Sequence, residues 1–268
     1  MKNFTFLAVL DFEATCADRT SVGKWDSSLQ EIIEIPMALV SIKDKCVVGS
    51  FDSFARPIEQ PVLTEFCTKL TSIKQSDVEA SPDIVEVVRN LQIWLDQHNA
   101  TAENTLVVTC GDWDLKNMWP RQVGLRPELQ TPRIFKSWCN LKFIYADKTK
   151  NKASGMMGML RALRIPHVGH HHRGRDDVRN LASIVISLLS QGATFKPTWT
   201  EEKRAGEYEK WLIKAKEVNS AIINKKDALS RLPDTVPVHV REELQASIKY
   251  LEVEAQRFSS MADVFSNN

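Results

Sequence analysis

The sequence has few of the features that mark membrane or secreted proteins. Its 268 residues contain no apolar run of the roughly 18–20 residues that cross a bilayer. The N-terminal segment reaches an acidic pair soon after its first apolar run, so it has neither the apolar core nor the cleavage site of a signal peptide. We therefore expect an intracellular protein of the cytoplasm or the nucleus, with no membrane attachment.

Cysteine is also scarce. The five cysteines are odd in number, and consecutive ones lie 21 to 43 residues apart. This spacing excludes a zinc site of the paired CxxC type and argues against a disulfide framework. We expect the cysteines to be free thiols.

Net charge is nearly absent at +1, but the charge is unevenly distributed. Residues 115–175 carry 13 lysines and arginines but only two acidic residues. Aromatic residues are interspersed among these cations, which is typical of surfaces that bind nucleic acid. The alternative is an ordinary solvated face whose aromatic side chains belong to the core.

Hydrophobic patterning predicts an α/β domain with a mixed sheet of five strands. A helix is expected to begin after Pro82, because apolar residues then recur at helical spacing. Two further helices are expected over residues 154–163 and 176–189. The expected strands cover residues 4–10, 31–42, 46–55, 105–110 and 133–135.

A domain boundary is predicted at Pro197, giving domains over residues 1–197 and 198–268. The second domain should be an α-helical hairpin broken near Pro233. Its second helix has an apolar seam that must be buried, and we expect it to pack on the first helix rather than on the first domain. The outer face would then be free for a protein or RNA partner. The seam consists of Leu244, Ile248, Leu251, Ala255 and Phe258.

Acidic residues follow two of the predicted strands. Asp11 and Glu13 come directly after the first strand, and residues two apart on a strand share a face. Paired carboxylates of this kind suit Mg²⁺ or Mn²⁺, although the same short pattern is common in loops. Asp112 and Asp114 follow the fourth strand, and the pattern leaves open which of them belongs to a site.

Histidines and aspartates also meet at the start of the last helix of the first domain. Two His-x4-Asp pairs exist, His171 with Asp176 and His172 with Asp177. Helical phase places Asp177 on the apolar stripe and Asp176 on the solvent face, which favours the pair of His172 and Asp177. A buried carboxylate needs a charge partner, and a metal supplies one. Together these clusters predict two-metal phosphoryl chemistry with histidine as the proton acceptor.

The combination resembles the DEDDh three-prime-to-five-prime exonucleases, and within them the Eri exoribonucleases related to the histone-mRNA exonuclease. The motifs are DFEATC at residues 11–16, the Trp-Asp pair at 113–114 and His172-x4-Asp177, and the resemblance covers about residues 5–192. It implies an RNase H-like fold, a five-stranded mixed sheet flanked by helices. It further implies two divalent metals held by Asp11, Glu13, Asp114 and Asp177, with His172 as the general base.

The resemblance implies an exoribonuclease that trims RNA with a single-stranded 3' end and releases nucleoside 5'-monophosphates. Substrate contacts are expected from His172 and from the apolar residues nearest the metals, while the ribose 2'-hydroxyl would be read at Ala14 and Thr15. Two alternatives are a DNA 3'-exonuclease of the same superfamily and an RNA-binding scaffold on a nuclease fold. The apolar residues proposed to hold the terminal base are Phe12, Trp113 and Leu115.

Overall fold

The computed structural model describes residues 4–18, 25–233 and 235–266. The chain forms two compact units. One unit comprises Met1–Gln122 with Glu128–Thr200, and the other comprises Val123–Pro127 with Glu201–Asn268.

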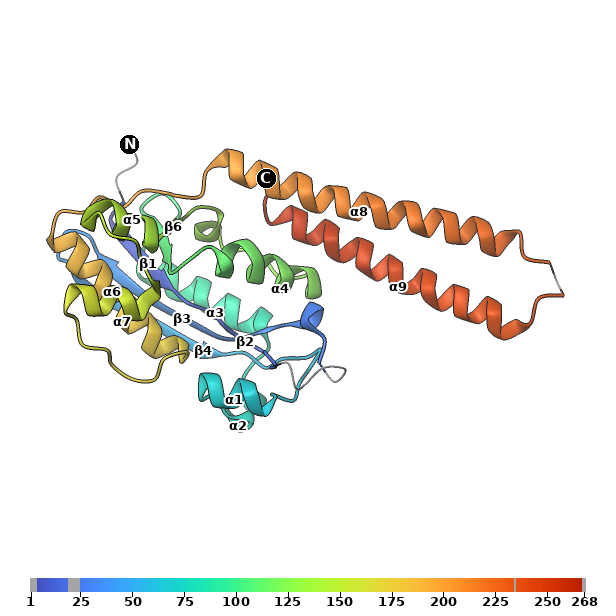
Figure 1. The fold of residues 1–268 in the computed structure, drawn as a ribbon, viewed down its shortest axis with the longest axis horizontal. Helices are drawn as coiled ribbons and strands as arrows, with labels where there is room; N and C mark the ends of the chain where they lie inside the picture. Colours follow the sequence, from blue (N-terminus) through green and yellow to red (C-terminus); the bar gives the residue numbers. More distant parts are fainter. Residues whose placement is uncertain (1–3, 19–24, 234, 267–268) are drawn as a thin grey trace. The chain divides into compact units, whose positions relative to one another are not determined.

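The first unit is built on a mixed sheet (Figure 1). Strand β1 runs antiparallel to β3 and parallel to β5, and β5 runs parallel to β6. Strand β2 pairs with one end of β3, and β4 pairs along β3 as well. The strands are β1 (Phe6–Leu10), β2 (Glu13–Ala14), β3 (Ile32–Ser41), β4 (Cys46–Phe54), β5 (Thr105–Thr109) and β6 (Trp138–Asn140).

The mixed α/β architecture agrees with the prediction, but two details of the sheet differ from it. The sheet has six strands within the described residues, because the two-residue β2 continues the chain beyond β1. The strand expected at residues 133–135 is instead a short 3-10 helix, Arg133–Lys136. The backbone becomes extended at Ser137, and β6 begins at the next residue. The predicted strand therefore lies a few residues before the observed one.

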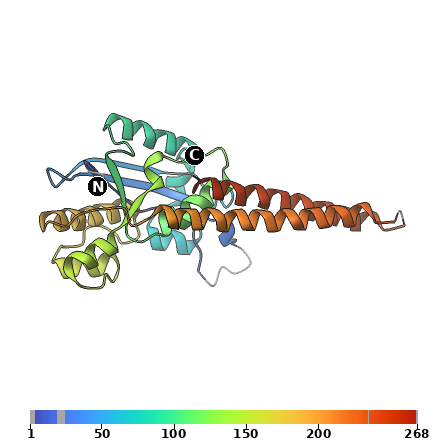
Figure 2. The same ribbon diagram turned by 90° about the horizontal axis from the view of Figure 1, so that it is seen from above.

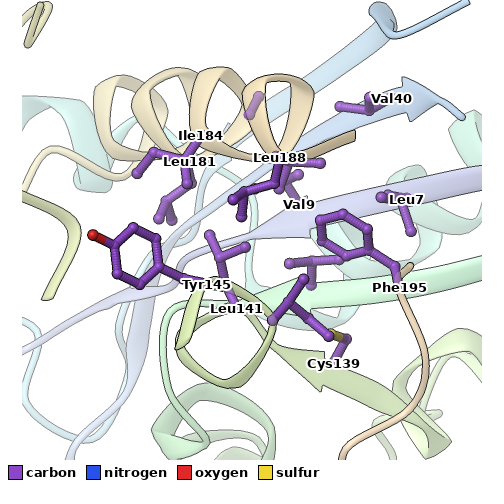
Figure 3. Close-up of a cluster of buried hydrophobic side chains, with 14 of the residues drawn as sticks. Leu7, Val9, Val40, Cys139, Leu141, Tyr145, Leu181, Ile184, Leu188 and Phe195 are labelled. Atoms are coloured by element: carbon purple, nitrogen blue, oxygen red, sulfur yellow. The ribbon is translucent and has the colours of Figure 1, made fainter. Parts of the chain in front are cut away.

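Helices cover both faces of the sheet (Figures 1 and 2). One face packs against α5 (Leu141–Thr149), α6 (Gly155–Leu163) and α7 (Gly174–Ser190) through alternate strand residues. Figure 3 shows this core, in which Leu181, Ile184 and Leu188 of α7 form one cluster with Val9 and Val40 of the sheet, and Leu188 lies nearest Val9. The other face carries α3 (Ile84–Gln97), whose Trp94 ring contacts Phe51 of β4.

Shorter helices connect these layers. Thr64 caps α1 (Glu65–Thr71) by accepting a hydrogen bond from the backbone of Cys67, and α2 (Gln75–Glu79) follows. A π-helical turn over Asp114–Met118 leads directly into α4 (Trp119–Leu125), and a 3-10 turn covers Ser27–Leu29.

The second unit contains the helical hairpin of α8 (Glu201–Ser230) and α9 (Val238–Asp263). The expected seam packs on the first helix of the hairpin, since Ile222 of α8 forms one cluster with Ile248 and Ala255 of α9. Leu244 and Leu251 pack against the same cluster. Phe258 stacks on Trp211, with ring centroids 5.9 Å apart. Among the described residues of both units, every helix is too short or too polar to cross a membrane.

The boundary between the units falls slightly later than the predicted Pro197. Trp199 is buried and stacks on Trp138 of β6, with ring centroids 4.2 Å apart. The Thr198 hydroxyl accepts a hydrogen bond from the backbone of Asn140. Residues 198–200 therefore pack with the first unit.

Candidate active site

The predicted carboxylates meet at one edge of the sheet. Asp11 follows β1, Glu13 opens β2, and Asp177 lies in the first turn of α7. Carboxylate oxygens of these three residues all lie within 4.8 Å of one another. Residues separated by more than 160 positions are thus brought to the carboxyl end of β1, where ligands bind in α/β sheets.

Asp114 lies at the same edge, because β5 is the parallel neighbour of β1. Its carboxylate accepts a hydrogen bond of 2.8 Å from the backbone N–H of Phe12, between the two acidic residues of the first motif. Asp112 instead accepts hydrogen bonds from Trp138 at 2.9 Å and Asn140 at 3.2 Å. Asp114 is therefore the carboxylate that joins the cluster, whereas Asp112 fastens β6 to the loop after β5.

Burial and like charge both disfavour ionisation of this cluster. Burial raises the pKa of Asp11 well above its ordinary value, and the charges of Asp114 and Asp177 raise it further. The pKa of Glu13 rises to about 10, first through burial and then through Asp11. Burial raises the pKa of Asp114 to about 6, although the hydrogen bond from the backbone of Phe12 acts to lower it. Carboxylates held this close are costly unless cations balance them.

The donor set fits divalent metal ions. It supplies carboxylate oxygens, which Mg²⁺ and Mn²⁺ prefer, and the charges of these carboxylates raise one another's pKa values. The residues that would hold the ions are Asp11, Glu13, Asp114 and Asp177.

Both candidate histidines contact Asp177. The Nδ1 of His171 lies 3.1 Å from its Oδ2, and the backbone N–H of His172 donates to the same oxygen at 2.8 Å. The two imidazole rings stack with centroids 3.9 Å apart. His172 has a φ of 67°, a left-handed conformation uncommon for a residue with a side chain, and this turn brings its amide toward Asp177. The cluster of His171, His172 and Asp177 does not by itself identify the base.

The expectation that Asp176 faces solvent was wrong. The residue is 8% exposed, and its carboxylate accepts a hydrogen bond of 3.0 Å from the backbone N–H of His170. The histidine loop folds back over this side of the helix, so helical phase alone misjudged its exposure. Asp176 holds the loop, while Asp177 on the next position joins the acidic cluster.

Two residues that contact the elements of the acidic cluster, Glu34 and Arg173, were not identified from the sequence. Glu34 lies opposite Glu13 in the β2–β3 register and is fully buried. Its carboxylate accepts hydrogen bonds of 3.0 Å from Arg173 Nε and from the backbone N–H of Gly174. A β-carbon at Gly174 would lie 3.2 Å from the Asp11 carbonyl oxygen and 2.8 Å from Pro36, so glycine permits this close approach. The sequence feature that could have pointed to Glu34 is a glutamate inside an otherwise apolar predicted strand.

Of the residues proposed to hold the terminal base, Trp113 alone is exposed, at 42%. Phe12 is 4% exposed and packs edge-on to Phe135, with centroids 6.0 Å apart, and Leu115 is 1% exposed. Both belong to the core, which argues against the predicted base contact for them. Ala14 and Thr15 are also buried. The Thr15 hydroxyl accepts a hydrogen bond of 3.0 Å from the backbone of Glu31.

Comparisons with known proteins agree with this geometry. ERI1 exoribonuclease 3 of Homo sapiens is 35% identical over 203 residues, which are 74% of this chain and 57% of the relative. ERI1 exoribonuclease 2 of Danio rerio is 33% identical over 76% of this chain and 38% of its own length. The chain thus spans 57% of the length of the first relative and 38% of the length of the second.

Solved structures give the same result for the fold. The nuclease domain of 3'hExo, a DEDDh family member bound to rAMP, superposes with a TM-score of 0.66 at 27% identity, covering 73% of this chain and 96% of that one. A 3'-exonuclease that recognises the histone mRNA stem-loop gives a TM-score of 0.66 at 26% identity, over 73% and 86% of the chains. The family profile described as Exonuclease matches residues 8–185, and the chain, which is similar to the ERI1 exoribonucleases, therefore belongs to the exonuclease family.

Proposed function

We propose that the protein is a metal-dependent 3'-to-5' exoribonuclease that trims RNA 3' ends and releases nucleoside 5'-monophosphates. The observation that carries the proposal is the convergence of Asp11, Glu13 and Asp177 within 4.8 Å, from two distant parts of the chain. The similarity to ERI1 exoribonucleases and to a DEDDh nuclease domain bound to rAMP supports it.

Two divalent ions, Mg²⁺ or Mn²⁺, bound by Asp11, Glu13, Asp114 and Asp177 would activate water and stabilise the charge that develops on the scissile phosphate. His172 then accepts the proton of the attacking water. Burial and the neighbouring His171 lower the pKa of His172, which keeps its imidazole neutral and able to accept that proton near neutral pH. The bond that breaks joins phosphorus to the 3' oxygen of the upstream nucleotide, so the released nucleotide keeps its 5'-phosphate.

The substrate is proposed to enter as a single strand. Trp113, exposed beside Asp114, offers a face on which a terminal base can stack. The Lys142 ammonium lies 3.8 Å from the position of a β-carbon on Gly111, two residues before this tryptophan in the chain, and is placed to contact a phosphate. Ala14 and Thr15 remain the proposed readers of the ribose, the former through its backbone.

An RNA substrate places the protein in the cytoplasm or the nucleus in this proposal. The proposed domains remain a nuclease, predicted over residues 1–197, and a helical extension, predicted over 198–268. We now place the boundary between them after Trp199. The outer face of the hairpin is proposed to bind a protein partner, since the hairpin helices carry the exposed apolar or aromatic residues Ile223, Tyr250 and Val253.

The proposal is tested with a labelled single-stranded RNA and a DNA of the same sequence, with Mg²⁺ or with EDTA. We expect Asp11→Ala and Asp114→Asn to abolish metal-dependent cleavage while RNA binding persists. Asp112→Asn is the matched control, because an amide oxygen still accepts the hydrogen bond from Trp138 and only the longer one from Asn140 is lost. Faster cleavage of the DNA would favour the DNA exonuclease, and binding without any cleavage would favour the scaffold.

A further inference from the structure

Two of the free cysteines lie against each other beside the acidic cluster. Cys16 follows β2 and is half-buried, and Cys67 lies in the first turn of α1 and is fully buried. Both belong to one apolar cluster with Ile33, Ile73 and Val78. They are 51 positions apart in the chain, so it is the fold that brings these two thiols together.

The backbones of the two residues are held together by a single hydroxyl. The Thr64 Oγ1 donates a hydrogen bond of 2.6 Å to the carbonyl of Cys16 and accepts one of 2.9 Å from the amide of Cys67. The Cys67 sulfur lies 3.8 Å from the carbonyl oxygen of Ala14, two residues before Cys16. Disulfide formation requires neighbouring backbones of this kind, because the bridge spans only a few ångströms between β-carbons.

The side chains interact as well. A hydrogen bond between the two thiols raises the pKa of Cys16 and lowers the pKa of Cys67. Burial opposes the shift at Cys67, and Cys16 is the thiol more accessible to a peroxide, because it is half-buried whereas Cys67 is fully buried. Burial also raises the pKa of Cys110 and Cys139, to about 12 in each case.

We propose that Cys16 and Cys67 are a redox modification site, which a peroxide converts reversibly to an intramolecular disulfide. One S–S bond forms, the two S–H bonds and the O–O bond of the peroxide break, and hydrogen peroxide is reduced to two molecules of water. A dithiol reductant reverses the step by thiol–disulfide exchange. The bridge would join α1 to the segment that follows Glu13.

The test uses the full-length protein in a Cys46→Ser background, because the exposed Cys46 is free to form bridges between molecules. The protein is treated with hydrogen peroxide, alkylated under denaturing conditions because Cys67 is fully buried in the folded state, digested and analysed by mass spectrometry, with and without earlier reduction by dithiothreitol. We expect the loss of two alkylatable thiols, a cross-linked peptide pair containing Cys16 and Cys67, and recovery of both thiols on reduction.

The added substitution Cys16→Ser should abolish the cross-linked pair, and Cys110→Ser, the matched control, should leave it unchanged. Cys16 is half-buried, so its replacement is compatible with folding, which circular dichroism checks directly. A peroxide-treated protein that keeps both thiols alkylatable, or that links Cys67 to another cysteine, would overturn the proposal. These readouts do not depend on nuclease activity, so the redox site and the proposed function can fail separately.

Discussion

Glu34 on β3 and Arg173 at the start of α7 form a buried ion pair across 139 positions of the chain. The Nε–Oε1 distance is 3.0 Å, and the two side chains are 0% and 13% exposed. Arg173 also lies over the Phe54 ring, 4.5 Å from its centroid. The pair fixes the start of the helix that carries Asp177 against the strand that pairs with Glu13, and so sets the spacing within the acidic cluster.

Glu34→Ala should destabilise the protein by about 3–5 kcal/mol, because it leaves a buried guanidinium and the Gly174 N–H without their partner. Glu34→Gln should cost less, since its amide oxygen still accepts from Gly174. Urea unfolding measures both. The control is Asp147→Asn, which removes the exposed pair with Lys150 and should change stability by no more than about 1 kcal/mol. Equal stability of Glu34→Ala and the wild type would show that the pair does not hold α7.

The metal-free protein should lose stability as the pH rises. The folded-state pKa values of Asp114 and Glu13, about 6 and about 10, lie above their ordinary values. A raised carboxyl pKa means that the folded state binds the proton more tightly, so stability is greatest below the unfolded pKa and falls as the pH rises toward the folded one. With EDTA, the Tm should therefore decrease from about pH 5 to about pH 8.

Divalent metal should reverse this decrease. Mg²⁺ or Mn²⁺ balances the ionised carboxylates, so the increase in Tm on adding metal should be larger at about pH 8 than at about pH 5. Asp11→Asn removes one of the charges and should weaken the dependence on pH. A metal-induced shift of the same size at both pH values would contradict the assignment of these residues as ligands.

His172→Ala should lower the cleavage rate by roughly 10²–10⁴-fold, the usual range for a general base. His171→Ala should lower the rate less than His172→Ala does. A small loss is expected from His171→Ala, because its ring stacks on His172 and contacts Asp177. His170→Ala is the matched control, because its exposed side chain lies in the same loop while its backbone N–H, which Asp176 accepts from, is kept. Single-turnover rates measure all three, and a greater loss in His171→Ala than in His172→Ala would assign the base to His171.

Truncation distinguishes the two proposed boundaries. A chain that ends after Thr200 keeps the stacking of Trp199 on Trp138, whereas one that ends after Pro197 loses it. Removal of a buried tryptophan side chain costs about 3–5 kcal/mol, so the shorter chain should melt at a clearly lower temperature. Thermal melts of the two truncated chains measure the difference, and identical Tm values would place the boundary at Pro197.

Much of the site followed from local patterns, because its carboxylates stand at strand ends and in a helix of clear phase. Strand alternation predicted that Asp11 and Glu13 share a face, and helical phase placed Asp177 on the apolar stripe of its helix. In the structure, carboxylate oxygens of all three lie within 4.8 Å of one another. The choice of Asp114 over Asp112 needed the family resemblance, since both follow the same strand. The contribution of Glu34 could not be predicted, because it depends on pairing between strands and on a contact with residue 173.

The burial of Asp176 and Phe12 escaped prediction for a similar reason. Asp176 is covered by the loop that precedes its own helix, and Phe12 is enclosed by Phe135 and Trp119 from the irregular part of the chain. Periodicity describes one element at a time, whereas these contacts arise between elements. The same holds for the six strands of the sheet, since a two-residue strand such as β2 has no period to detect.

The most direct test of the proposed activity is product analysis on one RNA in linear and circular form, each incubated with Mg²⁺ and the wild-type protein. An exonuclease acting from the 3' end releases nucleoside 5'-monophosphates from the linear RNA and leaves the circle intact, because the circle has no end to bind. EDTA or Asp114→Asn should stop the release. Internal cleavage of the circular RNA, or release of nucleotides without a 5'-phosphate, would contradict the proposed function.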